Sequence, residues 1–211
     1  MAKPIETFVV GPFETNCYLL RGRDDCWLVD PGLGPGRVIR HLQQAGLRPS
    51  RILLTHGHVD HMGGVPAVRN AFEDIRLCCP AGDCRMLGDP MANLSGVFGA
   101  AMTVDAVDER IGPGQVLRLG EIEWLALDTS GHTPGGLSYY AARTGLVLTG
   151  DALFAGGIGR TDFPGASTER LLQNIRQQLL TLPDSTRVLP GHGPESTIGA
   201  ERAANPFLLA P

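Results

Sequence analysis

The feature that most constrains this chain is a run of four potential metal ligands within six residues. They are two histidines, an aspartate and a third histidine in the sequence His56-Gly57-His58-Val59-Asp60-His61. Imidazole nitrogen and carboxylate oxygen both suit zinc, and imidazole also suits iron. One ion cannot easily take all four groups from so short a loop. We therefore expect two ions, with the first two histidines on one and Asp60 and His61 on the other.

Three further loops offer the ligands that two ions would still need. Each carries one candidate side chain at the end of an expected strand, next to glycine: His132, Asp151 and His192. Taken alone, a Gly-Asp pair after a strand is usually a turn. Together with the first loop, these residues indicate a metal site built from several strand ends. His41 lies within an expected helix without a partner motif, and we do not expect it to be a ligand.

The expected elements predict an α/β fold with two mixed sheets packed face to face and helices outside. Short apolar or alternating runs indicate strands at Ile5–Val10, Asn16–Arg21, Cys26–Asp30, Arg51–Thr55, Val116–Leu119, Glu121–Asp128, Leu137–Ala141, Leu146–Thr149 and Thr186–Leu189. Helical spacing indicates helices at Pro35–Leu47 and Thr168–Leu180, the second with Thr168 as its N-cap. His56–His61 is expected to be a loop. Asp89–Thr103, rich in Gly, Met and small residues, is expected to be a mobile loop over the site.

Length and composition narrow the classes of protein. With 211 residues we expect a single domain spanning residues 1–211. A net charge of −4 without a basic run argues against a nucleic-acid partner. No stretch of 18 apolar residues and no signal peptide is apparent, so neither a membrane span nor secretion is expected. The five cysteines, an odd number, fit reduced thiols and a cytoplasmic location.

These motifs resemble the metallo-β-lactamase superfamily. The likeness begins at Asn16-Cys17-Tyr18 and Asp30-Pro31-Gly32 and extends through the histidine and aspartate motifs. Within the superfamily the chain resembles the glyoxalase II (hydroxyacylglutathione hydrolase) group, which serves in methylglyoxal detoxification. Segments typical of that group are 130–136 (SGHTPGG) and 150–154 (GDALF). The ending, from Gly191-His192-Gly193-Pro194 to Asn205-Pro206-Phe207-Leu208, resembles its short bacterial type II branch.

The resemblance implies an αββα sandwich with a binuclear site at one edge. It assigns His56, His58 and His132 to the first metal, and Asp60, His61 and His192 to the second, with Asp151 bridging. It disfavours a true β-lactamase, in which a cysteine commonly replaces the bridging aspartate, because the cysteines here lie at 17, 26, 78, 79 and 84. Asp30 either accepts a hydrogen bond from a ligand histidine or merely caps the turn before Pro31-Gly32.

The implied activity is hydrolysis of a thioester such as S-lactoylglutathione. Two divalent ions, zinc first with iron and manganese as alternatives, would ionise a water as the nucleophile, and Asp60 would orient it. Arg160, nine residues after Asp151, stands where longer members place a basic residue, so it would contact a glutathione carboxylate. The alternative is that Arg160 ties down its own loop through Asp162 or Asp151.

The sequence also departs from the longer glyoxalase II proteins. Those carry a helical C-terminal domain and two tyrosines that this chain lacks, since 19 residues follow His192 and Asp162 replaces one of the tyrosines. We therefore expect a thioesterase with a high KM and a tolerance for several acyl groups. A homodimer could supply a missing wall, with Asp89–Thr103 as the cover.

Three other functions stay open. Persulfide dioxygenases share this fold, use one iron held by two histidines and an aspartate, and carry a segment like Gly159-Arg160-Thr161-Asp162-Phe163. A lactonase is the second alternative, within the hydrolases. A metal-binding protein without catalysis is the third, although the complete ligand set argues against it.

Overall fold

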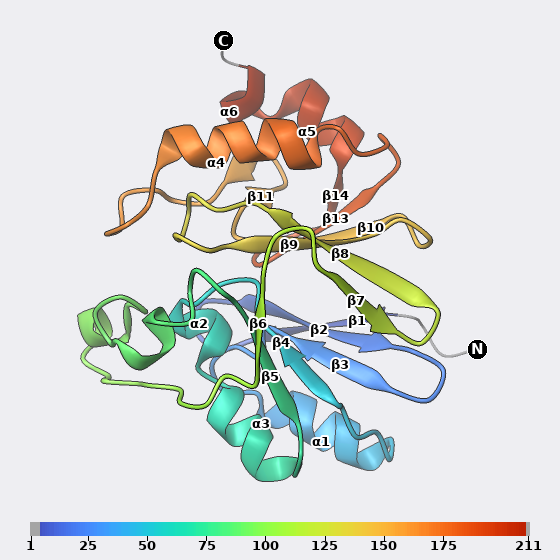
Figure 1. The fold of residues 1–211 in the computed structure, drawn as a ribbon, viewed down its shortest axis with the longest axis vertical. Coiled ribbons are helices and arrows are strands. Elements are labelled where there is room, and N and C mark those ends of the chain that lie inside the picture. The colour runs from blue at the N-terminus through green and yellow to red at the C-terminus, as the bar shows by residue number, and fades with distance from the viewer. Residues whose placement is uncertain (1–4, 210–211) are drawn as a thin grey trace.

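Two six-stranded sheets stack face to face between two layers of helices in the computed structural model, which describes residues 5–209 (Figure 1). The first sheet has the order β1 (Ile5–Val10), β2 (Thr15–Arg21), β3 (Cys26–Val29), β4 (Arg51–Leu53), β5 (Arg76–Pro80) and β6 (Glu109–Ile111). The second has the order β14 (Ser196–Thr197), β13 (Arg187–Pro190), β10 (Leu146–Gly150), β9 (Leu137–Ala141), β8 (Ile122–Asp128) and β7 (Val116–Leu119).

Both sheets are mixed. In the first, β1, β2 and β3 pair antiparallel, and β3 to β6 pair parallel. In the second, the pairing of β10 with β13 is parallel and the other pairings are antiparallel. The αββα sandwich that the sequence predicted is therefore confirmed.

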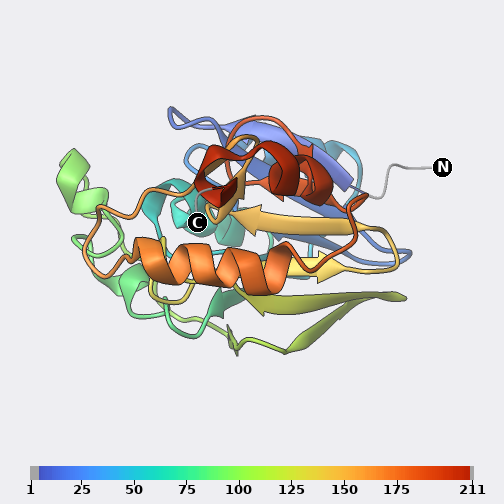
Figure 2. The same cartoon turned by 90° about the horizontal axis from the view of Figure 1, so that it is seen from above.

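Helices cover the outer face of each sheet (Figures 1 and 2). Below the first sheet lie α1 (Gly36–Gln44) and α3 (Val65–Ala71), and above the second lie α4 (Thr168–Asn174), α5 (Ile198–Ala204) and α6 (Pro206–Leu209). Shorter elements complete the chain: α2 (Val59–Met62), η1 (Met86–Gly88), η2 (Ser95–Phe98), β11 (Leu153–Phe154), β12 (Gly157–Ile158) and η3 (Ile175–Leu179). None of the helices between residues 5 and 209 combines the length and apolar character that a bilayer crossing requires.

The core is built in three layers because the inner strands are buried on both faces. Along β2, Cys17 and Leu19 pack toward the first helical layer, whereas Tyr18 and Leu20 pack between the sheets. In β13, Val188 belongs to the layer under α4 and α5, and Leu189 faces the other sheet. This alternation follows from the two-residue period of a strand, so each inner strand contributes side chains to two core layers.

Two expectations about local structure are wrong. The helix expected at Thr168–Leu180 is present, but its N-cap is Ser167 and not Thr168, because the Ser167 side chain accepts from the Arg170 N–H. Its second half, η3, is one turn of π-helix. His56–His61 is not a loop throughout, because Asp60 and His61 lie in α2. A single helical turn sets these two side chains on adjacent positions facing one site.

Candidate metal centre

All seven candidate ligands meet at one edge of the sandwich. His56 and His58 follow β4, and Asp60 and His61 come from the helical turn α2. Each of the other three follows the C-terminal end of a strand of the second sheet: His132 after β8, Asp151 after β10 and His192 after β13. Because these strands end at the same edge, loops that lie far apart in the sequence come together there.

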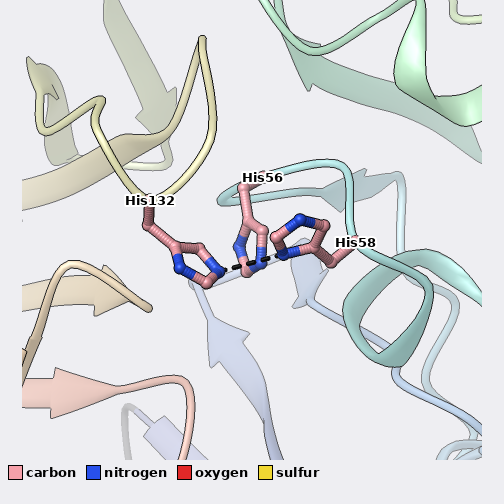
Figure 3. Close-up of side chains that lie close together, drawn as sticks. All are labelled: His56, His58 and His132. Carbon is pink, nitrogen blue, oxygen red and sulfur yellow. Dashed lines mark hydrogen bonds between the residues drawn. The ribbon is translucent and has the colours of Figure 1, made fainter. Parts of the chain in front are cut away.

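The first group consists of three buried histidines, His56, His58 and His132 (Figure 3). Their ligand atoms all lie within 4.8 Å of one another. Figure 3 shows the three rings turned toward a common point, with His58 Nδ1 2.9 Å from His132 Nε2. Two imidazole nitrogens this close repel through their lone pairs unless a proton or a cation lies between them, so the arrangement suits a shared proton or a bound cation.

The second group consists of Asp60, His61 and His192, again with ligand atoms within 4.8 Å. Asp60 Oδ2 lies 3.1 Å from His192 Nε2 and 3.5 Å from His61 Nε2. The two groups flank Asp151, whose Oδ1 is 3.2 Å from His61 Nε2 and whose Oδ2 is 3.6 Å from His132 Nε2. Asp151 can therefore reach both groups at once. That each group holds an ion remains a prediction.

Hydrogen bonds on the far side of the rings fix the tautomer of three histidines. His61 Nδ1 lies 2.9 Å from Asp30 Oδ2, His192 Nδ1 lies 2.9 Å from the Phe13 carbonyl, and His132 Nδ1 lies 2.6 Å from the Arg160 carbonyl. A carboxylate or carbonyl only accepts, so each Nδ1 carries a proton, and Nε2 is the nitrogen that faces the site and can bind a metal ion when it is unprotonated. Of the two alternatives for Asp30, the structure shows the hydrogen bond to a histidine.

The position of the His56 proton is set through Thr55. The Thr55 hydroxyl donates to Asp30 Oδ2 at 2.7 Å, so it can only accept from His56 Nδ1, 3.1 Å away. His56 Nε2 is then a bare lone pair, buried and without a hydrogen-bond partner among the described residues. A buried acceptor of this kind is costly unless a cation or donor fills its direction. The donor set therefore fits divalent metal ions of the zinc or iron class.

The ionisation of the site residues also fits metal binding. Burial lowers the pKa of His58 to about 3, so its ring is neutral at pH 7, as a ligand must be. Burial alone would raise the pKa of Asp151, but the neighbouring His61 outweighs it and holds that pKa well below its usual range. For His61, burial is outweighed by Asp60, Asp151 and Asp30, which raise its pKa well above the ordinary value. Metal binding must displace a proton from His61.

Arg160 lies at the rim and is tied to its own loop. Its guanidinium pairs with Asp162 at 2.7 Å and lies 4.6 Å from the centroid of the Phe163 ring. Its backbone carbonyl is the group that orients His132. The tie through Asp162 is thus one of the two contacts that the sequence left open. The contact with a substrate carboxylate stays a prediction.

Sequence reasoning missed Asp83, a fully buried carboxylate that joins two ligand loops. It accepts from the Gly57 N–H at 3.0 Å, between His56 and His58, and from the Thr133 hydroxyl at 2.7 Å and the Gly135 N–H at 2.6 Å, just after His132. The sequence does mark this residue, because Gly82-Asp83 comes just after the strand β5 in the same way that Asp151 comes just after Gly150 at the end of β10.

We expect Asp83→Ala to cost about 3 kcal/mol or more of unfolding free energy, since three donors would lose their acceptor at roughly 1 kcal/mol or more each. The loosened loops should also weaken metal affinity by about 10–100-fold. Asp83→Asn, which keeps one acceptor oxygen, should fall between. Urea denaturation and metal titration of both variants test this. Wild-type values for Asp83→Ala would show that the loops hold themselves.

Removing the metal should lower the melting temperature. A ligand at one hundred times its Kd stabilises the native state by about 2.7 kcal/mol. For a chain of this size each 1 kcal/mol shifts the melting temperature by roughly 2–4 °C. We therefore expect a chelator to lower it by about 5–11 °C, and added Zn²⁺ to restore it. A melting temperature that changes neither with chelator nor with added metal would contradict the prediction that bound metal stabilises the fold.

Comparison with known proteins places this geometry in context. The sequence model described as "Metallo-beta-lactamase superfamily" matches residues 10–192. The chain is 42% identical over 200 residues to the probable metallo-hydrolase YqgX of Bacillus subtilis (strain 168), covering 94% of each chain. It is 33% identical over 207 residues to the hydroxyacylglutathione hydrolase GloC of Haemophilus influenzae, covering 97% of each.

Solved structures agree on the fold. BLEG-1, a protein named as a B3 metallo-β-lactamase, is 36% identical with a TM-score of 0.92 (98% of this chain, 100% of that one). TTHA1623 in a di-iron-bound form is 35% identical with a TM-score of 0.86 (96% and 100%). ETHE1 from Myxococcus xanthus is 26% identical with a TM-score of 0.78 (96% and 83%).

Proposed function

Since the chain belongs to the metallo-β-lactamase superfamily, we propose that it is a metal-dependent hydrolase of acyl thioesters, S-lactoylglutathione among them. One observation carries the proposal: the ligands form one side of a cavity of about 300 Å³, which His58, Asp60, His132, Asp151 and His192 all line. That volume lies at the lower end of the range of small-molecule sites, roughly 300–1,000 Å³. A small carbonyl substrate can therefore reach the ligand set directly. The likeness to a hydroxyacylglutathione hydrolase supports a thioester as the substrate.

Two divalent ions, when bound, would ionise a water near neutral pH and stabilise negative charge on a carbonyl oxygen. His56, His58 and His132 would hold the first ion, and Asp60, His61 and His192 the second, with Asp151 shared. Asp60 would also accept a hydrogen bond from the attacking water and so orient it. The leaving thiolate has a conjugate acid with a pKa of about 8.5, so it needs little help from a general acid.

Two further candidates rest on specific likenesses. The resemblance of the segment Gly159-Arg160-Thr161-Asp162-Phe163 to persulfide dioxygenases keeps that iron-dependent activity open, with one ion instead of two. The BLEG-1 likeness adds β-lactam hydrolysis, because a protein named as a β-lactamase is 36% identical to this chain. The lack of a cysteine at a ligand position is therefore weaker evidence against β-lactams than the sequence suggested.

One preparation can separate these functions. The protein is purified without added metal, its metal content is determined, and it is assayed with S-lactoylglutathione, a lactone, a β-lactam and, by oxygen consumption, glutathione persulfide. We expect two divalent ions per chain and the highest kcat/KM with the thioester. Rapid oxygen uptake with one iron per chain, or a higher kcat/KM for the lactone or β-lactam, would overturn the proposal.

Arg160→Ala should raise the KM for glutathione thioesters by about twofold to fivefold and leave kcat unchanged, as expected for loss of a contact made equally in ground and transition states. The effect is small because Arg160 is exposed and already paired with Asp162. Arg143→Ala is the matched control. Arg143 lies on the β9–β10 turn, and its substitution breaks a similarly exposed ion pair with Glu121, which lies between β7 and β8. An unchanged KM with a lower melting temperature would assign Arg160 to its loop alone.

A further inference from the structure

The cavity over the ligands has apolar walls. Seven aromatic or aliphatic side chains line it together with the ligands: Phe13, Val59, Leu94, Phe98, Phe154, Ile158 and Phe163. They come from four separate segments of the chain, so no single stretch of the sequence predicts this surface. A substrate that reaches the ligands must therefore place part of itself against hydrocarbon.

The apolar walls begin at the ligands themselves. The Phe163 ring lies edge-on to His58 and His132, with centroids 5.4 Å and 5.9 Å apart. On the other side, the Phe154 ring lies 6.2 Å from that of His192. A phenylalanine ring therefore lies beside the histidines of each of the two groups.

The outer wall is anchored at its base. Phe98, at the end of η2, packs edge-on against Phe13 with ring centroids 5.1 Å apart. The fully buried Asn93 holds the segment, because its carbonyl accepts from the Val59 N–H at 2.9 Å and its side chain donates to the Met102 carbonyl at 2.9 Å. The next residue, Leu94, takes a left-handed backbone conformation (φ 70°), which is rare for a leucine and persists only where its surroundings impose it. The wall is thus built in advance.

The cavity offers little to a polar group. Among the described side chains that line it, Arg160 carries the only guanidinium, and Asp162 already pairs with that group. The other polar lining groups are the candidate ligands. A hydroxyl on the acyl group, as in a lactoyl substrate, would therefore lose water without gaining a dedicated partner.

We propose that this pocket selects thioesters with an apolar aliphatic or aromatic acyl group over hydroxyacyl ones, and that Phe98 and Phe163 are its specificity-determining residues. The inference rests on the proposed thioester hydrolysis and names its substrate class. Burial of one methylene group contributes enough to change affinity about threefold to fourfold.

The test measures binding apart from hydrolysis. Dissociation constants of S-methyl-, S-propyl-, S-hexyl- and S-(2-hydroxypropyl)glutathione, thioethers that cannot be hydrolysed, are obtained by calorimetry with the metal-loaded protein. The kcat/KM values of propionyl-, hexanoyl- and lactoylglutathione are measured alongside. We expect Kd to fall about threefold per methylene, and the hydroxypropyl compound to bind at least about fivefold more weakly than the propyl one.

Matched variants locate the effect. Phe98→Ala and Phe163→Ala should reduce the dependence on chain length to less than about twofold per methylene. Phe207→Ala should keep it, because Phe207 is also exposed (49%, against 60% for Phe98) but lies on α6 outside the cavity. Metal content, measured for each variant, shows that the site is intact.

The outcomes separate the two proposals. Equal Kd values along the series, tighter binding of the hydroxypropyl compound, or no binding of any thioether would overturn the apolar pocket. A clear chain-length dependence of binding without hydrolysis of any thioester would keep the pocket and overturn thioester hydrolysis. Hydrolysis with the same kcat/KM for every acyl group, together with equal Kd values along the thioether series, would support thioester hydrolysis and overturn the apolar pocket.

Discussion

Replacing Asp151 by alanine should lower kcat/KM for the thioester by about a thousandfold and leave fewer than two ions per chain. Among residues 5–209, Asp151 is the one carboxylate whose oxygens approach histidines of both groups, at 3.2 Å and 3.6 Å. Loss of a group that merely orients a ligand typically costs about 10–100-fold in metal affinity or activity. Loss of a shared ligand should cost more, because it also removes a negative charge from between two cations.

Metal analysis and steady-state kinetics on the same preparation measure the effect. Asp151→Asn keeps the volume and one acceptor oxygen but loses the charge, so it should retain one ion more readily than the alanine variant. Asp24→Ala, at an exposed aspartate on the β2–β3 turn, is the control and should match wild type. Two ions and near-normal activity in Asp151→Ala would show that the two groups hold their ions without a shared carboxylate.

Replacing Gly191 by alanine should lower activity by about a hundredfold or more through steric displacement of the ligands. A Cβ at Gly191 would lie 2.2 Å from Asp151 Oδ1 and 2.7 Å from His61 Cε1. The backbone has little freedom to retreat, because the Gly191 N–H donates to the Gly150 carbonyl at 2.8 Å and its carbonyl accepts from the Asn16 N–H at 2.7 Å. The carboxylate must move instead, and overpacking of this kind typically costs about 1–3 kcal/mol.

Metal stoichiometry, kcat/KM and the melting temperature of Gly191→Ala test this prediction together. Gly112→Ala serves as its control, since a Cβ there would meet nothing within 4 Å and the residue is not in the left-handed region. Full metal content with normal kinetics would mean that the site tolerates a shift of Asp151. The close approach of residue 191 to Asp151 would then not matter for activity.

The sequence by itself determined the ligand candidates and the fold class. His56, His58, Asp60 and His61 are neighbours in the chain, so their proximity needed no knowledge of the fold. The inner strands could be predicted because a strand buried on both faces reads as a short continuous apolar run, as β3 and β10 do. The convergence of Asp151 with the first loop was inferred from chemistry and from the family resemblance, since their separation along the chain carries no information about distance.

Only the tertiary structure decided how the ligands are held and what lies over them. The protons of His132 and His192 are fixed by the backbone carbonyls of Arg160 and Phe13, and every residue has a carbonyl, so the sequence cannot mark these two. Asp83 accepts from Thr133, 50 residues away, and from Gly57, and these hydrogen bonds between the two ligand loops exist only once the loops have met. The apolar walls likewise arise from four distant segments. Ligand identity is a local chemical property, whereas orientation, proton position and cavity lining are set by long-range packing.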